Sequence, residues 1–154
     1  GGVIGFKGET YSFEPIQSVP GSIQQPHPPI LIGGVSDPAL RRIALRGDGW
    51  LATALGREQM PERLTALKKI SEAEGRRFDE LQLVYKLFLS PGEPKKGPFG
   101  GRDMGSGSEA EIKDDLKAII DAGFEKIVIR FRGTDAGEQT RNLKHFAETI
   151  APAL

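Results

Sequence analysis

The sequence predicts an α/β fold built on a parallel sheet, and three observations support this prediction. After residue 29, short apolar runs alternate with segments of helical periodicity four times, as in strands joined by helical crossovers. The runs ILI, LVYKLFL and IVIRF are nearly continuous, which is typical of strands covered on both faces. The chain has 154 residues, of which 38% are hydrophobic and 27% charged, and this suffices for one domain with a core.

Residues 1–29 are predicted to form an extended arm or hairpin followed by a proline-rich linker. Phe6, Gly8, Tyr11 and Phe13 alternate with polar residues, which indicates short strands. The prolines of QSVPGSIQQPHPP then exclude both a helix and a continued β-ladder. All four strand–helix units are therefore expected within residues 30–154.

The four units follow from the positions of apolar residues and of helix caps. The predicted strands are Ile30–Ile32, Trp50–Ala52, Leu81–Leu89 and Lys126–Phe131. The helices are expected from Pro38 to Gly47, from within 57–61 to Gly75, from a capping box of Ser108 and Glu111 to Gly123, and near the end of the chain. The side chains expected to face the core are Ala39, Leu40, Ile43, Ala44, Met60, Leu64, Leu67, Ile70, Ile112, Leu116, Ile119, Ile120, Leu143, Phe146, Ala147 and Ile150.

A long connection separates the third strand from the third helix. Its sequence, SPGEPKKGPFGGRDMGSG at residues 90–107, is rich in glycine and proline, so we expect no regular structure between Pro91 and Gly107. The segment could be a mobile lid or a disordered insertion, and the sequence leaves both open. Its Lys95, Lys96 and Arg102 are more typical of a solvated loop than of an anion site.

Two architectures accommodate the four units. The helices could divide between the two faces of a small doubly wound sheet. Alternatively, they could all cover one face of an open half barrel, whose bare face would need another polypeptide segment. Periodicity alone does not decide between the two.

Composition excludes several classes of protein. The 21 basic residues balance the 21 acidic residues, so neither nucleic acid nor a membrane surface is expected as a partner. The absence of cysteine excludes disulfides and thiolate chemistry, and no group of side chains has metal-ligand spacing. Because no apolar run is long enough to span a bilayer and no signal peptide is evident, the cytoplasm is the expected compartment.

The glycine pair after the first strand is the strongest candidate site. In IGGVSDP the backbone can turn sharply, and Ser36 or Asp37 is expected to cap the following helix. The amides around Gly33, Gly34, Val35 and Ser36 would then point outward from a helix N-terminus, which is favourable for a phosphate group. A tight turn before a capped helix, with no ligand, explains the same residues equally well.

Three segments together resemble the luciferase-like monooxygenase family, the flavin- and deazaflavin-dependent TIM-barrel oxidoreductases. They are QQPHPPILIGGVSDPALRRIALRGDGW, FKGETYSFEPI and AIIDAGFEKIVIRF. The resemblance implies the C-terminal half of a TIM barrel, with four parallel strand–helix units behind a hairpin-like arm. It also implies FMN or coenzyme F-420 as the cofactor, with its phosphate held by Gly33, Gly34, Val35 and Ser36.

Other candidate residues have a structural and a functional interpretation. Trp50 could stack on a flavin ring or fill the core, and Thr53 just past its strand could face the cofactor. Asp48 between two glycines is interpreted as a side-chain-to-backbone turn. His27 and His145 are expected to lack acidic partners, and neither is assigned a catalytic role.

The resemblance implies that the chain is part of an oxidoreductase or monooxygenase acting on a small molecule. No catalytic acid or base is assigned, because much of the family's substrate pocket belongs to the first half of its barrel. The alternative is a non-catalytic half-barrel binding or assembly module. In either case the bare sheet face predicts a homodimer or association with the missing N-terminal barrel half.

Overall fold

The chain forms an open parallel sheet with helices along one side. The structure, a computed structural model, describes residues 2–17, 19–98, 100–131 and 135–154. The four main strands are β3 (Leu31–Gly33), β4 (Gly49–Thr53), β5 (Gln82–Pro91) and β7 (Lys126–Phe131), all parallel and adjacent in this order. Since β5 pairs with both β4 and β7, it is the central strand of the sheet.

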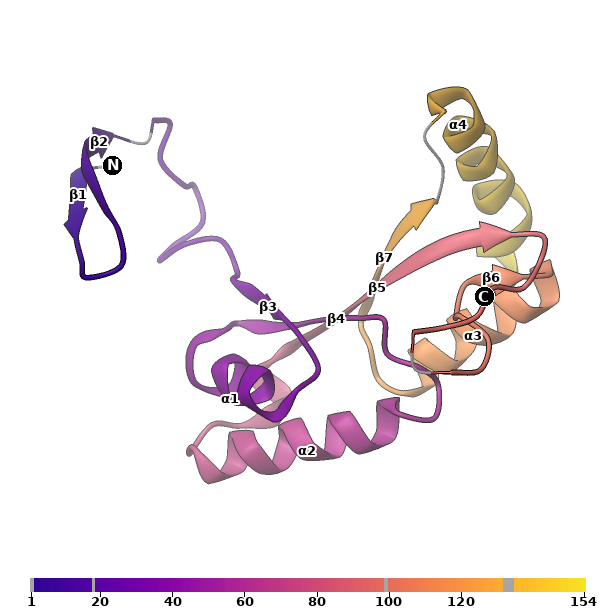
Figure 1. The fold of residues 1–154 in the computed structure, drawn as a ribbon, viewed down its shortest axis with the longest axis horizontal. Coiled ribbons are helices and arrows are strands. Elements are labelled where there is room, and N and C mark those ends of the chain that lie inside the picture. The colour runs from indigo at the N-terminus through magenta and orange to yellow at the C-terminus, as the bar shows by residue number, and fades with distance from the viewer. Residues whose placement is uncertain (1, 18, 99, 132–134) are drawn as a thin grey trace.

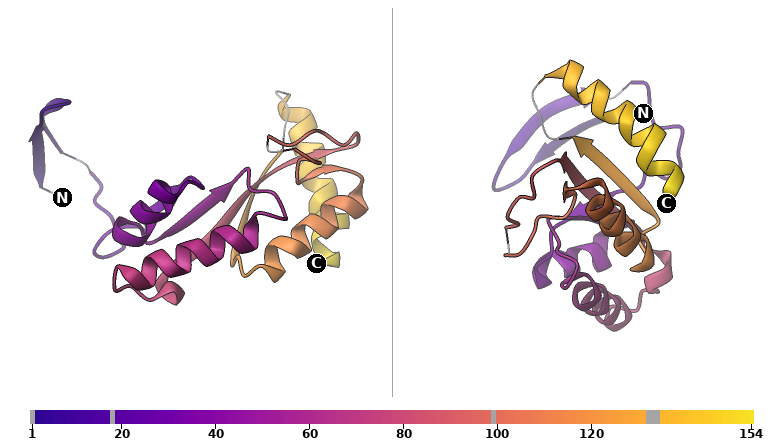
Figure 2. Two further views of the ribbon diagram at one scale, coloured as in Figure 1. Left: turned by 60° about the horizontal axis from the view of Figure 1, so that its bottom comes forward. Right: turned by 90° about the vertical axis from the view of Figure 1, so that its right-hand side faces the viewer.

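The helices connect consecutive strands. They are α1 (Asp37–Arg46), α2 (Met60–Ala73), α3 (Glu109–Asp121) and α4 (Ala136–His145), with 3₁₀ turns at Phe78–Glu80 and Ala151–Ala153 and a π turn at Phe146–Ile150. Figures 1 and 2 show α1, α2 and α3 on the same side of the sheet. Phe131 of β7 meets Phe146, which follows α4, with ring centroids 6.2 Å apart. The sheet does not close, so the chain has the predicted half-barrel architecture rather than a doubly wound sheet.

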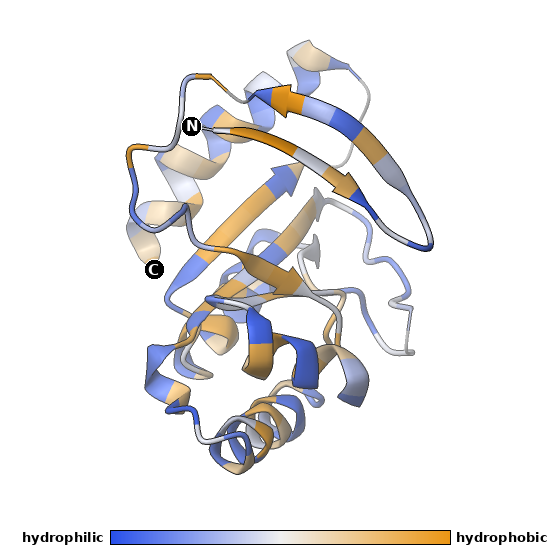
Figure 3. Cartoon of the chain, turned by 90° about the vertical axis from the view of Figure 1, so that its left-hand side faces the viewer, coloured by the Kyte–Doolittle hydropathy of each residue, from blue (hydrophilic) through white to orange (hydrophobic). Residues whose placement is uncertain are grey.

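The core lies between the sheet and its helices. Alternate residues of each strand point to the helices, and Trp50, Tyr85 and Leu89 are almost fully buried there. Leu40 of α1 and Leu67 of α2 pack against these side chains. A stripe of apolar residues on α3, called the α3 stripe, packs there too. The α3 stripe consists of Ile112, Leu116 and Ile119. Figure 3 shows hydrophobic segments in the strands of the sheet, interrupted by hydrophilic residues.

Three of the side chains expected in the core are exposed instead. Ile120 is 45% exposed and Leu143 57% exposed, and Ala147 is also exposed. The π turn at Phe146–Ile150 widens the helical repeat, so residues spaced for an α-helix no longer share one face. As a result the last segment packs through Phe146 and Ile150 and not through Leu143 or Ala147.

The N-terminal arm is a two-stranded hairpin. Strands β1 (Val3–Lys7) and β2 (Ser12–Gln17) pair antiparallel, and every residue of both strands is exposed. The rings of Phe6, Tyr11 and Phe13 lie within 5.4 to 6.5 Å of one another. Figure 1 shows the hairpin extending away from the sheet and helices, so it contributes nothing to the core.

The long connection after β5 has more structure than predicted. Strand β5 continues to Pro91, and a short β6 (Ser106–Gly107) pairs parallel with Ser90–Pro91. A bridge joins Lys96 and Arg102 within the loop. Met104, Gly105, Ser106 and Gly107 are buried. The prediction of an irregular segment was therefore wrong at both of its ends, because long-range pairing with β5 overrides the local preference of glycine and proline.

None of the helices in the described ranges is long and apolar enough to cross a membrane.

Candidate functional site

The turn between β3 and α1 is built around Gly34. Its φ is +109°, in the left-handed region, and a Cβ atom placed on it would lie 2.7 Å from Cβ of Ala39. Any side chain here would be strained and would clash with the first turn of α1. The glycine pair predicted from the sequence is thus required by the backbone, at Gly34 above all.

The three carbonyl groups of this turn are all hydrogen-bonded to the protein. The indole Nε1 of Trp50 donates to the carbonyl of Gly34 at 2.8 Å. Nη1 of Arg63 donates to the carbonyl of Val35 at 3.4 Å, and the amide of Leu40 donates to the carbonyl of Ser36 at 2.9 Å. The turn is therefore fixed from its carbonyl side by β4, α2 and α1.

The amide groups of the same turn have no hydrogen-bond acceptor among the residues that the structure describes. Within the described ranges, the N–H groups of Gly34, Val35 and Ser36 donate to no backbone or side-chain acceptor. Ser36 is the N-cap residue of α1, with φ −75° and ψ 156°, but its side chain makes no capping hydrogen bond. The expected side-chain cap, whether from Ser36 or from Asp37, is therefore absent. Free amides at the start of a ten-residue helix can donate hydrogen bonds to a bound anion, and the helix dipole favours negative charge there.

An acidic residue beside the amides is hydrogen-bonded by an arginine. Asp37 lies in the first turn of α1, where its charge alone would repel an anion. Nη1 of Arg63 donates to Oδ1 of Asp37 at 2.9 Å, and Nη2 donates to Glu62 at 2.6 Å. The hydrogen bond with Glu62, followed by that with Asp37, raises the pKa of Arg63, so the guanidinium stays charged. Because Arg63 is shared between Asp37 and Glu62, these three side chains together carry one negative charge beside the turn.

Trp50 and Thr53 lie on β4 beside this turn. Trp50 is fully buried, with its ring centroid 5.8 Å from that of Phe124, and it acts on the turn through its hydrogen bond to Gly34. Thr53 is half-buried at the carboxyl end of β4, in register with Lys86 of β5. Thr53 is therefore at the end of the sheet that carries the β3–α1 turn, whereas Trp50 lies near the start of β4 and reaches the turn with its indole.

Strained backbone marks the residue after Thr53. Ala54 has φ +55°, and it is the only non-glycine residue in the described ranges with a positive φ. Such strain is concentrated at functional sites in proteins. The sequence gives no signal for it, because an alanine carries no preference for this conformation.

A small cavity of about 40 Å³ lies at the carboxyl ends of β4 and β5. It is lined by Ala54–Gly56, by residues 85–88 of β5 and by residues of the loop after β5. The hydroxyl of Tyr85 donates to the carbonyl of Leu55 and so fixes one wall. Burial raises the pKa of Tyr85 to about 12, and the phenol stays neutral at physiological pH.

The loop after β5 is anchored by an ion pair that the sequence analysis missed. Nη2 of Arg102 donates to Oδ1 of Asp115 at 2.6 Å, Nη1 donates to Oδ2 at 2.8 Å, and the amide of Gly105 also donates to Oδ2 at 2.8 Å. Asp115 is 1% exposed. The hydrogen bond to Asp115 raises the pKa of Arg102. Arg102 is therefore an anchor and not a solvated loop residue. The available signal was an aspartate on the apolar stripe of α3, three residues after Ile112.

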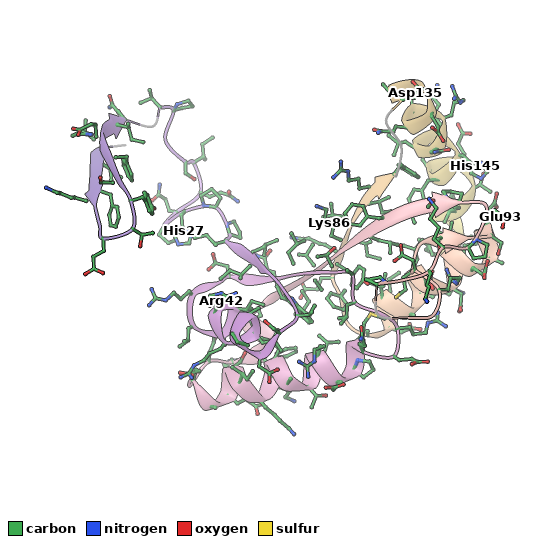
Figure 4. All side chains as sticks on the ribbon, in the orientation of Figure 1. His27, Arg42, Lys86, Glu93, Asp135 and His145 are labelled. Carbon is green, nitrogen blue, oxygen red and sulfur yellow. The ribbon has the colours of Figure 1, made fainter. Side chains whose placement is uncertain are left out.

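Both histidines have acidic neighbours, contrary to expectation. Nδ1 of His27 is 3.8 Å from Oδ2 of Asp48, and Nε2 of His145 is 2.8 Å from Oε1 of Glu109. Asp48 also accepts a hydrogen bond from the amide of Ile30 at 2.7 Å, so its side chain reaches the residue before β3 and not a neighbouring backbone group, as a local turn would require. Figure 4 shows His27 and His145 far apart on different parts of the chain. Within the described ranges, no three His, Asp or Glu side chains could together hold a metal.

Comparison with known proteins gives a consistent result. The family model described as luciferase-like monooxygenase matches residues 1–96. An uncharacterised protein of Mycobacterium tuberculosis is 28% identical over 153 residues, covering 94% of this chain and 45% of its own. The chain thus spans about half the length of the curated relatives it matches.

Two solved structures share the fold. One is an F420-dependent secondary alcohol dehydrogenase in complex with an F420–acetone adduct, at TM-score 0.70 and 11% identity, covering 98% of this chain and 56% of that one. The other is riboflavin lyase with modified FMN and riboflavin, at TM-score 0.61 and 13% identity, covering 99% and 48%. At these identities the likeness concerns the fold alone.

Proposed function

This chain belongs to the luciferase-like monooxygenase family, and on that premise we propose that it is the half of a flavin- or deazaflavin-dependent oxidoreductase that holds the cofactor's phosphate. The observation that carries the proposal is the β3–α1 turn, whose carbonyls are all engaged while the amides of Gly34, Val35 and Ser36 are free. The cofactors named for the two similar structures, F420 and FMN, both contain a phosphate.

In this proposal each residue near the turn has a defined role. The amides of Gly34, Val35 and Ser36 bind the phosphate, as the glycine pair suggested. Trp50 holds the turn in place, and Thr53 faces the cofactor from the end of β4. The cofactor itself would supply the hydride or oxygen chemistry. The residues present fit this cofactor because the turn offers amide donors at a helix N-terminus, and the side chain of Asp37 is held by Arg63.

The whole enzyme requires a second half barrel. The open sheet face would be covered by a segment equivalent to the rest of the relatives' length, and a small-molecule substrate would bind between the two halves at the carboxyl ends of the strands. Closure by a second copy of this chain is the alternative arrangement.

The Ser36→Asp variant tests the phosphate site without disturbing the fold. Ser36 is exposed, makes no capping hydrogen bond, and occupies a position where aspartate is a favourable N-cap. The added charge should weaken phosphate binding at least about tenfold, measured by amide NMR shifts of residues 34–36. Ser36→Asn, equal in shape and uncharged, is the matched control and should bind phosphate as the parent does. Gly34→Val is unsuitable, since the strain at Gly34 would disturb the turn itself.

A parallel measurement compares FMN with riboflavin, which lacks the phosphate. The parent chain and Ser36→Asn should prefer FMN, and Ser36→Asp should lose that preference. Equal binding of FMN and riboflavin by the parent chain would contradict the proposed phosphate site. FMN binding with no turnover after the missing half barrel is added would instead assign the chain to a binding or assembly module.

A further inference from the structure

The open face of the sheet carries an arrangement of two cations around one aromatic ring. Nζ of Lys86 lies 5.3 Å from the ring centroid of Phe88, and Cζ of Arg130 lies 5.9 Å from the same centroid. The register places Lys86 opposite Val128 and Phe88 opposite Arg130, so the three side chains share the face of the sheet opposite the core residues Tyr85 and Leu87. Figure 4 shows Lys86 projecting to the side of β5 away from α2 and α3.

Neither cation has an acidic partner in the part of the chain that the structure describes. Arg57, Arg63, Arg77 and Arg102 all form ion pairs, whereas within the described ranges no carboxylate lies within 4.0 Å of Lys86 or of Arg130. The ring of Phe88 attracts both cations, but it does not cancel their mutual repulsion. Covering this face would remove water from both charges, and a buried cation requires a compensating anion.

The position of the pair favours a small-molecule ligand over a covering segment. Phe88 and Arg130 lie near the carboxyl ends of β5 and β7, and Lys86 is in register with Thr53 at the carboxyl end of β4. Lys86 and Phe88 also line the small cavity shared with Ala54–Gly56. Parallel barrels bind their ligands at this end. A third cation, Lys126, lies on the same face at the opposite end of β7, away from the aromatic ring and the cavity.

We propose that Lys86 and Arg130 form a binding site for an anionic group, a phosphate or a carboxylate, on the small-molecule substrate. This inference rests on the proposed function, since the substrate would face the cofactor held at the β3–α1 turn. Phe88 positions the two cations and offers an apolar surface to the part of the substrate next to its anionic group.

The test is an amide NMR titration of the chain with inorganic phosphate, and separately with acetate. We expect saturable shifts at residues 86, 88 and 130, in addition to the shifts at 34–36. Lys86→Gln and Arg130→Gln should each weaken the binding reported by residues 86, 88 and 130 about tenfold or more, because each variant removes one charge-assisted contact. Saturation by phosphate but not acetate would define a phosphate site, and the reverse would define a carboxylate site.

Lys126→Gln is the matched control, since it removes the same charge from the same face and should change the affinity by less than about twofold. Equal losses in Lys86→Gln and Lys126→Gln, or no saturable shifts at residues 86, 88 and 130, would overturn the inference. Ser36→Asp separates the two sites, because it should remove the shifts at residues 34–36 and leave the shifts at residues 86, 88 and 130. Arg130 is exposed, so its variant reports on binding even if substitution of the half-buried Lys86 disturbs the strand.

Discussion

The two faces of the same sheet differ in their surroundings. On the helix side, Tyr85, Leu87 and Leu89 of β5 are at most 2% exposed. On the open side, Val128 of β7 is 48% exposed and Lys86 and Arg130 have no acidic partner within the described ranges. The open side nevertheless carries the apolar residues Phe88 and Val128 beside these cations. One face of the sheet is thus completed by the chain's own helices, and we propose that a second component covers the other.

The largest expected effect is a cavity on the covered face. Leu87→Ala should lower the free energy of unfolding by about 2–5 kcal/mol, because it empties a buried site. Val128→Ala, on the neighbouring strand and the open face, should cost about 0.5 kcal/mol. Chemical denaturation measures both. Similar losses in the two variants would mean that the open face is covered in solution.

The next effect concerns the loop after β5. This loop is held by Asp115, a buried residue of α3 on the covered side of the sheet. Asp115→Asn removes the charge that pairs with Arg102 and should lower the free energy of unfolding by about 2 kcal/mol. It should also accelerate hydrogen exchange at Gly105 and Ser106. The control is Asp114→Asn, since Asp114 pairs with Arg57 at an exposed position and should contribute at most about 0.5 kcal/mol. Unchanged exchange in Asp115→Asn would show that the loop is held by β6 alone.

A smaller effect is expected on association through the open face. We expect the isolated chain to self-associate, and Val128→Glu should weaken this association about tenfold by placing a charge in the apolar contact. Sedimentation over a range of concentrations measures it. Leu143→Glu is the control, because Leu143 is equally apolar and exposed but lies on α4, outside the sheet. If the parent chain is monomeric, the open face of the sheet is not covered by a second copy, and this expectation is refuted.

The smallest effect is the acid dependence of the capping box on α3. Hydrogen bonds from the backbone amide of Ser108, and then from its hydroxyl, lower the pKa of Glu111 below its ordinary value of 4.5. The carboxylate therefore stabilises the folded state above about pH 4.5, and this contribution is lost as the pH falls through the lowered pKa. Glu111→Gln should make the free energy of unfolding less dependent on pH, in this acid range only. If the stability of the variant falls as steeply with decreasing pH as that of the parent chain, the acid dependence belongs to other carboxylates.

Local interactions made part of the site predictable from the sequence. The capping box of Ser108 and Glu111 depends on residues three apart, and both of its hydrogen bonds are present. The turn at Gly34 depends on a glycine pair and a following helix, and its positive φ agrees with that pattern. The anchor between Arg102 and Asp115 was not predicted, because the loop could pair with any of several acids until the fold placed it on α3.

The sequence by itself determined the order of four parallel strand–helix units, the ends of most helices and the glycine turn. These features depend on periodicity and on neighbouring residues, which a chain carries before it folds. Only the tertiary structure decided which sheet face is covered, that Trp50 holds the turn by donating to the carbonyl of Gly34, and that Lys86 and Arg130 both lie over the ring of Phe88. Each of these depends on the register between strands distant in sequence, and register is fixed by the packing of the whole sheet.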